Sequence, residues 1–287
     1  MFDIWNYTNE LATEVYHKDN ILIRIKKNDN AKKRLCVIYC SSNNIWYPNT
    51  ESCFREQLIE KDRYEWTNFS HPDAEKEIFV RDIYKSWYVT GVNSRLNTID
   101  ALIAYLKDEV QGFSVVTIGS SAGGYLAAIL GYFLDAEHTI AFSPQFELEN
   151  QWAIDLNPFL RNYQSDPNRN KYYDLKAVLA KSNVPIFYIV PIKSEIDRYH
   201  YNHIQGINCI HPFVFNDSHH GVVMLKENLS AFIYKSTNDL LELQSKHRNA
   251  INKLLLSIEL VGVRITIKGI CKECVRYIKR MLQTRTR

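Results

Sequence analysis

Short apolar runs alternate along this chain with longer stretches in which apolar residues recur at helical spacing. Residues 93–110 and 122–134 follow the helical period, and a further helical stretch is expected from about Val222. Seven short runs are rich in β-branched and aromatic residues, which favours strands. They span 21–26, 34–40, 76–81, 113–118, 138–142, 184–190 and 211–215. This alternation predicts an α/β protein with a mostly parallel sheet covered by helices on both faces.

The composition is that of a globular protein with a sizeable core. Hydrophobic residues make up 46% of the 287 residues and charged residues 23%, which argues against extensive disorder. We predict one main domain over residues 1–245. Within it, residues 145–172 are rich in Asn, Pro and aromatic residues and form a candidate small lid. Residues 246–287 are predicted to form a helical, basic C-terminal extension.

The charge is concentrated at the C-terminus. Residues 261–287 contain eight Lys or Arg and one Glu, a local charge of +7 in a chain whose net charge is +3. Basic residues recur every four positions with apolar residues between them, which predicts an amphipathic basic helix. Two interpretations stay open: a terminal helix docked on the domain, or a helix that contacts an anionic membrane surface. The β-branched residues at 263–267 also leave a strand open for the first part. The basic series is Arg264, Lys268, Lys272, Arg276 and Arg280.

Several features bear on the cellular compartment. The N-terminal residues include acids and show neither a basic nor an apolar signal-peptide region, and no run of about 18 apolar residues is present. The six cysteines are scattered along the chain, which favours reduced thiols. We therefore expect a cytoplasmic protein, with peripheral contact at the inner membrane face through its tail and no nucleic-acid partner.

A glycine cluster marks the strongest candidate for chemistry. Of ten glycines in the chain, three fall within residues 119–124, and Gly119 to Gly123 spell G-x-S-x-G around Ser121. The motif lies between a predicted strand and a predicted helix, which is the setting of a nucleophile elbow. The alternative is an ordinary glycine-rich turn. In the elbow interpretation, the Ala122 N–H at the helix start is a candidate oxyanion donor.

A serine nucleophile requires a base and an acid, and both are expected after later strands in the order Ser, acid, His. Asp197 follows the strand at 184–190 and is preferred over Glu195, because its short side chain suits a fixed hydrogen bond to imidazole. His219 follows the strand at 211–215 and is preferred as the base, with His220 as the alternate. The adjacent histidines lack an acidic or cysteine partner at ligand spacing, so no metal site is predicted.

Other candidate groups are less specific. The second oxyanion donor is expected in the loop after the strand at 34–40, from the N–H of Ser41 or Ser42, although a plain Ser/Asn turn fits equally. Cys271 and Cys274 form a lone C-x-x-C, which does not predict a zinc site. The charged and aromatic segment at 79–91 could stack against sugars or simply pack. Its residues of interest are Arg81, Asp82, Trp87 and Tyr88.

Over residues 21–235 the chain resembles the α/β-hydrolase superfamily. More narrowly, it resembles small α/β-hydrolase-like proteins of bacterial capsule and surface-polysaccharide loci, some of which are O-acetyltransferases. The segments that carry this likeness are IGSSAGGY, IAFSPQ and SHHGVVMLK, together with Asp197. The resemblance implies that Ser121 takes an acyl group, with His219 as the base and Asp197 orienting it.

The resemblance also bounds the reaction. The acyl group would pass to water, as in an esterase, or to a glycan hydroxyl, with acetyl-CoA as the candidate donor. No bound cofactor is implied. The alternative is a non-catalytic accessory protein of glycan assembly or secretion that retains the fold. The intact order of Ser121, Asp197 and histidine favours the enzyme.

Overall fold

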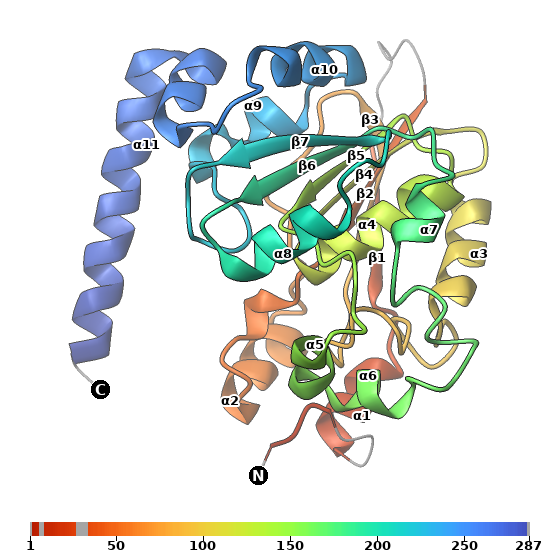
Figure 1. Cartoon of the computed structure of the whole chain (residues 1–287). Coiled ribbons are helices and arrows are strands. Elements are labelled where there is room, and N and C mark those ends of the chain that lie inside the picture. Colours follow the sequence, from red (N-terminus) through yellow and green to blue (C-terminus); the bar gives the residue numbers. More distant parts are fainter. Residues whose placement is uncertain (1, 6–8, 27–33, 286–287) are drawn as a thin grey trace.

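The computed structural model describes residues 2–5, 9–26 and 34–285 and is built around one seven-stranded sheet. All neighbouring strands run parallel except the first pair, β1 and β3, which is antiparallel. Figure 1 shows the sheet at the centre of the molecule. In spatial order the strands are β1 (Ile21–Ile25), β3 (Ala74–Val80), β2 (Leu35–Cys40), β4 (Ser114–Ser120), β5 (His138–Phe142), β6 (Ile186–Pro191) and β7 (Ile210–Phe215).

Helices cover both faces of this sheet, as the alternating pattern predicts. On one face pack α3 (Ile99–Glu109), α4 (Ala122–Phe133), α7 (Lys176–Leu179) and α8 (Glu195–His203). On the other face pack α9 (Leu229–Ile233) and α10 (Thr237–Lys246). Every residue of β2 and β6 is buried, because helices cover both faces of the sheet. Strands in such a position are apolar throughout.

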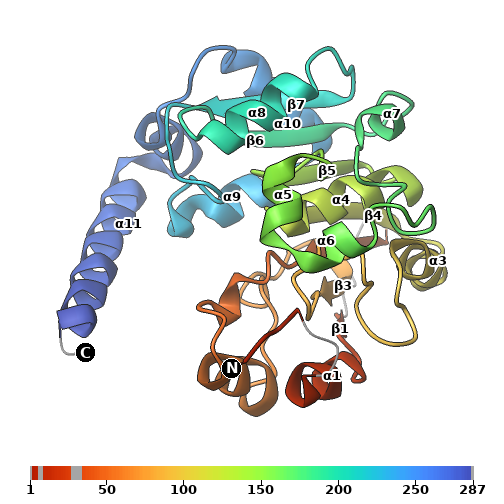
Figure 2. The ribbon, with the colours of Figure 1, turned by 60° about the horizontal axis from the view of Figure 1, so that its bottom comes forward.

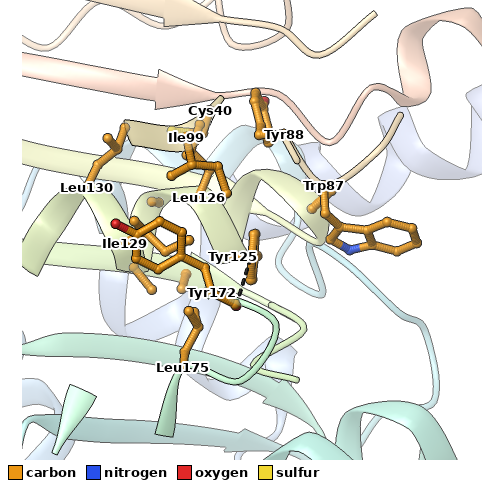
Figure 3. Close-up of a cluster of buried hydrophobic side chains, with 14 of the residues drawn as sticks. Cys40, Trp87, Tyr88, Ile99, Tyr125, Leu126, Ile129, Leu130, Tyr172 and Leu175 are labelled. Carbon is orange, nitrogen blue, oxygen red and sulfur yellow. Dashed lines mark hydrogen bonds between the residues drawn. The ribbon is translucent and has the colours of Figure 1, made fainter. Parts of the chain in front are cut away.

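The larger core surrounds α4, which is buried along nearly its whole length. Figure 3 shows Leu126, Ile129 and Leu130 of this helix packed among side chains from other segments. The only polar link drawn there runs from the Tyr125 hydroxyl to the Tyr172 carbonyl, at 2.8 Å. A helix fixed in this way holds its N-terminal residue, and therefore the turn before it, in a defined place.

The topology is that of the α/β-hydrolase fold. Each of the seven predicted strands is present, and the central strand β4 leads through Ser121 directly into α4. The first strand along the chain, β1, lies at the edge and pairs with β3 rather than with β2, its neighbour in sequence. The predicted fold class is confirmed.

The N-terminal region and the segment at 145–172 pack at one end of the sheet. Helix α1 (Glu10–Tyr16), α2 (Glu51–Phe54), a 3-10 turn η1 (Asn44–Trp46) and a π-helical turn η2 (Arg55–Glu60) share a satellite cluster. The 145–172 segment contains α5 (Gln151–Leu156) and α6 (Pro158–Asn162), and Phe159 of α6 joins that cluster. The segment is therefore packed against the main body.

The C-terminal residues form α11 (Lys253–Arg285), a helix kinked at Gly262, where φ is 79°. Leu256 anchors its first part in the core, and its second part contacts the 3-10 turn η3 (Lys226–Asn228). Residues 263–267 are helical, so the strand alternative is wrong. The structure describes side chains of α11 as far as Arg276. Within the described residues, no helix has both the length and the apolar character that crossing a bilayer requires.

Candidate active site

Ser121 lies in a strained turn between β4 and α4. Its φ of 52° and ψ of −122° fall outside the regions that non-glycine residues prefer. The residues two positions before and after Ser121 must be glycine. A Cβ on Gly119 would overlap the Gly123 carbonyl, and a Cβ on Gly123 would overlap the Cys40 carbonyl. The turn is therefore a nucleophile elbow in geometry, and its hydroxyl projects from the end of the central strand.

Ser121 begins a chain of hydrogen bonds that reaches a buried carboxylate. Its Oγ lies 2.9 Å from Nε2 of His220. The other ring nitrogen of His220, Nδ1, lies 3.1 and 3.0 Å from the two carboxylate oxygens of Asp197. Since a carboxylate only accepts, Nδ1 carries the proton and Nε2 presents its lone pair to the serine hydroxyl. This is the arrangement that lets an imidazole remove a serine proton.

The histidine in this chain is His220, so the preference for His219 is wrong. The loop after β7 turns at Asp217, whose carboxylate accepts the His219 N–H at 2.9 Å. His219 is exposed as a result. His220 comes immediately before Gly221, whose φ of 103° reverses the chain and whose carbonyl accepts the Ser143 hydroxyl at 3.1 Å. That reversal is what brings the second histidine, rather than the first, over Ser121.

The carboxylate in this hydrogen-bond chain belongs to Asp197, whereas Glu195 is exposed in the first turn of α8. Asp197 is fully buried, and its carbonyl accepts the Tyr188 hydroxyl at 3.2 Å. Ser194 caps the helix by accepting the Asp197 N–H at 3.4 Å. The carboxylate is thus fixed beneath the imidazole by the first turn of a helix.

The two amides predicted after β2 are already engaged, so Ser41 and Ser42 are wrong as oxyanion donors in this conformation. The Ser41 N–H donates to the Val80 carbonyl at 2.9 Å and continues the β2–β3 ladder. The Ser42 N–H donates to a Glu65 carboxylate oxygen at 2.6 Å. The other Glu65 oxygen accepts the Asn44 N–H at 2.8 Å.

The Ala122 amide remains in the predicted position. The first hydrogen bond of α4 runs from the Tyr125 N–H to the Ser121 carbonyl, at 3.0 Å. The Ala122 N–H precedes that bond and belongs to the helix turn whose amides have no intrahelical acceptor. A helix N-terminus also carries a partial positive charge, which favours a developing oxyanion.

Gln145 is a residue of the site that sequence reasoning missed. Its Nε2 lies 3.3 Å from Ser121 Oγ and 3.3 Å from His220 Nε2. Its Oε1 accepts the indole N–H of Trp87 at 2.9 Å. Because an indole N–H can only donate, Trp87 fixes which end of the amide is the oxygen. Both ends lie near the serine, since Oε1 is 3.4 Å from Ser121 Oγ. The sequence signal was its position, three residues after β5.

Trp87 is held in turn by a buried loop rather than exposed for stacking. Asp82 is fully buried and accepts the N–H groups of Tyr84, Ser86 and Tyr88 at 3.1, 2.5 and 2.9 Å. Burial raises the pKa of Asp82 to about 6. Trp87 has a positive φ of 52°, and Figure 3 shows its ring at the edge of the core cluster. Of the two alternatives for residues 79–91, the structure shows packing: Arg81, Asp82, Trp87 and Tyr88 are all buried.

A cavity of about 490 Å³ is lined by Ser120, which precedes Ser121, and by His220 of the hydrogen-bond chain. The rest of its lining comes from the loop after β2, the segment at 63–69, the segment at 219–229, and Glu273 of α11. Aromatic side chains and charged groups are mixed in this lining. The lining includes Glu65, Trp66, Phe69, His220, Lys226 and Glu273.

Comparison with known proteins finds similarity in structure only. No protein-family model matches the sequence, and no curated protein matches it. The capsule O-acetyltransferase of Neisseria meningitidis serogroup A aligns at 13% identity and a TM-score of 0.41, over 66% of this chain and 76% of that one. MGS-MChE2, an α/β-hydrolase enzyme from a lagoon-sediment metagenome, aligns at 14% identity and 0.41, over 78% and 99%. Est816, an N-acyl homoserine lactone degrading enzyme, aligns at 13% and 0.41, over 78% and 96%.

Proposed function

We propose that this chain is a serine-dependent acyl enzyme, with Ser121 as the nucleophile, His220 as the base and Asp197 as the acid that orients it. One observation carries the proposal: the continuous hydrogen-bond chain from the buried carboxylate through the imidazole to a serine in a strained elbow. Strain at a non-glycine residue persists where the surrounding structure enforces it, and such residues cluster at active sites.

The chemistry follows from the direction of these hydrogen bonds. Ser121 Oγ attacks the acyl carbonyl while its proton moves to Nε2 of His220, and Asp197 stabilises the resulting imidazolium. The tetrahedral intermediate collapses as the carbonyl carbon loses its leaving group, which takes the proton from His220. Water or an alcohol then gives its proton to His220 and attacks the acyl-serine carbonyl. The second tetrahedral intermediate collapses as the bond between the acyl carbon and Ser121 Oγ breaks, and Oγ takes the proton back from His220.

The oxyanion of each intermediate is assigned to two donors, the Ala122 N–H and the Gln145 side-chain NH₂. Gln145 replaces the donor that was predicted in the β2 loop, because the Ser42 N–H already binds Glu65. Its amide is fixed by Trp87 before substrate arrives, so little reorganisation accompanies charge development. Each such donor contributes roughly 3 kcal/mol to lowering the barrier in a water-excluded site.

The acceptor is proposed to be a hydroxyl of a bacterial surface glycan, with acetyl-CoA or another activated acetyl ester as donor. The cavity of about 490 Å³ suits a sugar ring better than a long chain. Trp66 and Phe69 offer apolar faces, and Glu65 and Lys226 offer hydrogen-bonding edges, which matches the faces and edges of a pyranose.

Acetyl transfer is tested by following thiol release from acetyl-CoA and product release from an acetyl ester, with and without surface glycans. Acyl-group turnover that needs a glycan indicates transfer, and equal turnover in water alone indicates hydrolysis. Ser121→Ala should abolish both with an unchanged melting temperature. Turnover retained in Ser121→Ala, or absent in the native protein with every acyl donor, would contradict the proposal.

A further inference from the structure

Exposed apolar side chains are concentrated on the C-terminal helix. Among the described residues, eleven large hydrophobic side chains are exposed, and seven of these lie on α11. A soluble surface normally scatters such residues singly, and a contiguous group marks an interaction site. The seven are Leu254, Leu255, Ile258, Val263, Ile265, Ile267 and Val275.

One side of α11 beyond Gly262 is docked on the domain. Thr266 is buried, and Gly269 lies against Glu227 and Leu225 of the domain. Lys272 and Arg276 reach the same Glu227 carboxylate, at 3.7 and 2.6 Å. Some of the basic residues therefore hold the helix to the body, as the docked interpretation predicts.

The opposite side of the same helix is free and has a different composition. Val263, Ile267 and Val275 are 56%, 55% and 51% exposed. Arg264 and Lys268 are exposed beside them, and no ion pair of either is found in the described part of the chain. Figures 1 and 2 both show this part of α11 standing away from the sheet, so nothing else in the ribbon covers its outer side.

We propose that the outer side of α11 binds the surface of an anionic membrane, with its apolar residues in the headgroup region and Arg264 and Lys268 on the lipid phosphates. An amphipathic helix with a basic border fits such a surface. A second copy of this chain fits less well, because pairing two such sides would bring like charges together. This inference does not depend on the proposed chemistry.

The position of α11 gives the interaction a consequence for the cavity. Glu273, from the docked side of α11, lines the same cavity as Ser120 and His220. A helix bound to the membrane by its outer side would hold that cavity about one helix diameter, roughly 10 Å, from the lipid headgroups. A substrate attached to lipid could then reach it without leaving the surface.

The electrostatic part is tested by sedimentation of the full-length protein with vesicles of phosphatidylglycerol and phosphatidylcholine at low salt. Arg264→Gln with Lys268→Gln should weaken partitioning by about 30-fold. The matched control is Lys107→Gln with Lys181→Gln, which removes the same charge from exposed positions on α3 and near α7, at the other side of the molecule. The control should bind like the native protein. Equal binding of the two variants would overturn the proposal.

The apolar part is tested with the chain's own cysteines. Cys271 and Cys274 are exposed on α11, and Cys53 is half-buried on α2. A polarity-sensitive fluorophore on Cys271, with Cys53→Ser and Cys274→Ser, should shift to the blue with anionic vesicles. The same dye on Cys53, with Cys271→Ser and Cys274→Ser, should not. A blue shift that appears without lipid as protein concentration rises would identify a dimer instead, and a shift as large with pure phosphatidylcholine would exclude charge recognition.

Discussion

The loops that follow β2 and β5 occupy equivalent places on either side of β4, but only the β5 loop forms a hydrogen bond with the Ser121 hydroxyl. Both strands flank β4, so both loops meet the elbow at the same edge of the sheet. After β2, the Ser42 N–H is bound to Glu65, within hydrogen-bond distance at 2.6 Å. After β5, the side chain of Gln145 reaches Ser121 Oγ at 3.3 Å. The polar groups of the first loop bind other parts of the protein, and the second loop brings a polar side chain to Ser121.

The position of a loop beside Ser121 therefore does not by itself show that the loop supplies an oxyanion donor. A backbone amide can serve an oxyanion only if nothing else accepts it, and Glu65 is a charged acceptor that binds it strongly. The oxygen of Gln145 accepts the Trp87 indole N–H, and the Gln145 NH₂ group has only Ser121 and His220 as partners among the hydrogen bonds of the described residues.

The largest effect is expected at His220, the proposed base. His220→Ala should lower kcat by about 10³-fold or more, because it removes the only proton acceptor on Ser121 Oγ in the proposed mechanism. His219→Ala is the matched control and should change kcat by less than about tenfold. Acyl-ester turnover by each variant provides the measurement. The reverse order of effects would restore His219 as the base.

The second effect compares the two loops directly. Gln145→Ala should lower kcat by about 10²-fold with little change in KM, because an oxyanion donor acts in the transition state. Glu65→Gln should change kcat by less than about tenfold. If Glu65→Gln instead causes the larger loss in kcat, the β2 loop rather than the β5 loop supplies the donor.

The third effect concerns the structural role of the β2 end. Gly123→Ala should destabilise the protein by about 2 kcal/mol or more, because the added Cβ overlaps the Cys40 carbonyl. Gly206→Ala is the control: it also introduces strain, at a φ of 83°, but nothing lies within 4 Å of the added atom. Urea unfolding of both variants gives the two free energies. Equal losses would mean that close packing at the elbow matters less than backbone strain.

The fourth effect tests how Gln145 is oriented. Trp87→Phe removes the indole N–H that fixes Oε1, while keeping an aromatic ring in the same place. We expect kcat to fall by about tenfold, which corresponds to roughly 1.4 kcal/mol, with a melting temperature close to that of the native protein. A kcat equal to that of the native protein would show that other contacts hold the amide.

The smallest effect concerns His200, which lies one helical turn after Asp197. It changes the free energy of unfolding only below about pH 6.5. Burial lowers its pKa from 6.5 to about 4. Between these values the unfolded chain binds a proton that the folded protein does not, so stability present above pH 6.5 is lost as the pH falls toward 4. Buried Asp82, whose pKa is raised to about 6, gives the opposite slope. His200→Gln should therefore lose less stability than the native protein between pH 6.5 and 4 in urea unfolding. An unchanged slope would contradict this account.

The fold could be predicted from the sequence because its signals are local. β-branched runs and the helical period of 122–134 mark the strands and α4, and the glycines around Ser121 mark the turn between them. Asp197 could be placed for the same reason, since it follows a strand by a few residues. The C-terminal helix was visible from its four-residue repeat of basic residues.

The details of the site could not be predicted, because they depend on contacts between distant segments. Nothing near Ser42 in sequence shows that Glu65 binds its amide across 23 residues. Gln145 acquires its place through Trp87, 58 residues away. The choice between His219 and His220 rests on the turn at Asp217 and the positive φ of Gly221. The sequence alone does not show which of two adjacent histidines faces Ser121.

The central claim is that Ser121 is a nucleophile activated by His220. It is tested most directly by treating the protein with a fluorophosphonate and locating the adduct by mass spectrometry. We expect one adduct, on Ser121. It should form at the native rate in His219→Ala and be lost or strongly slowed in His220→Ala. An adduct on another residue, or equal labelling of the native protein and His220→Ala, would contradict it.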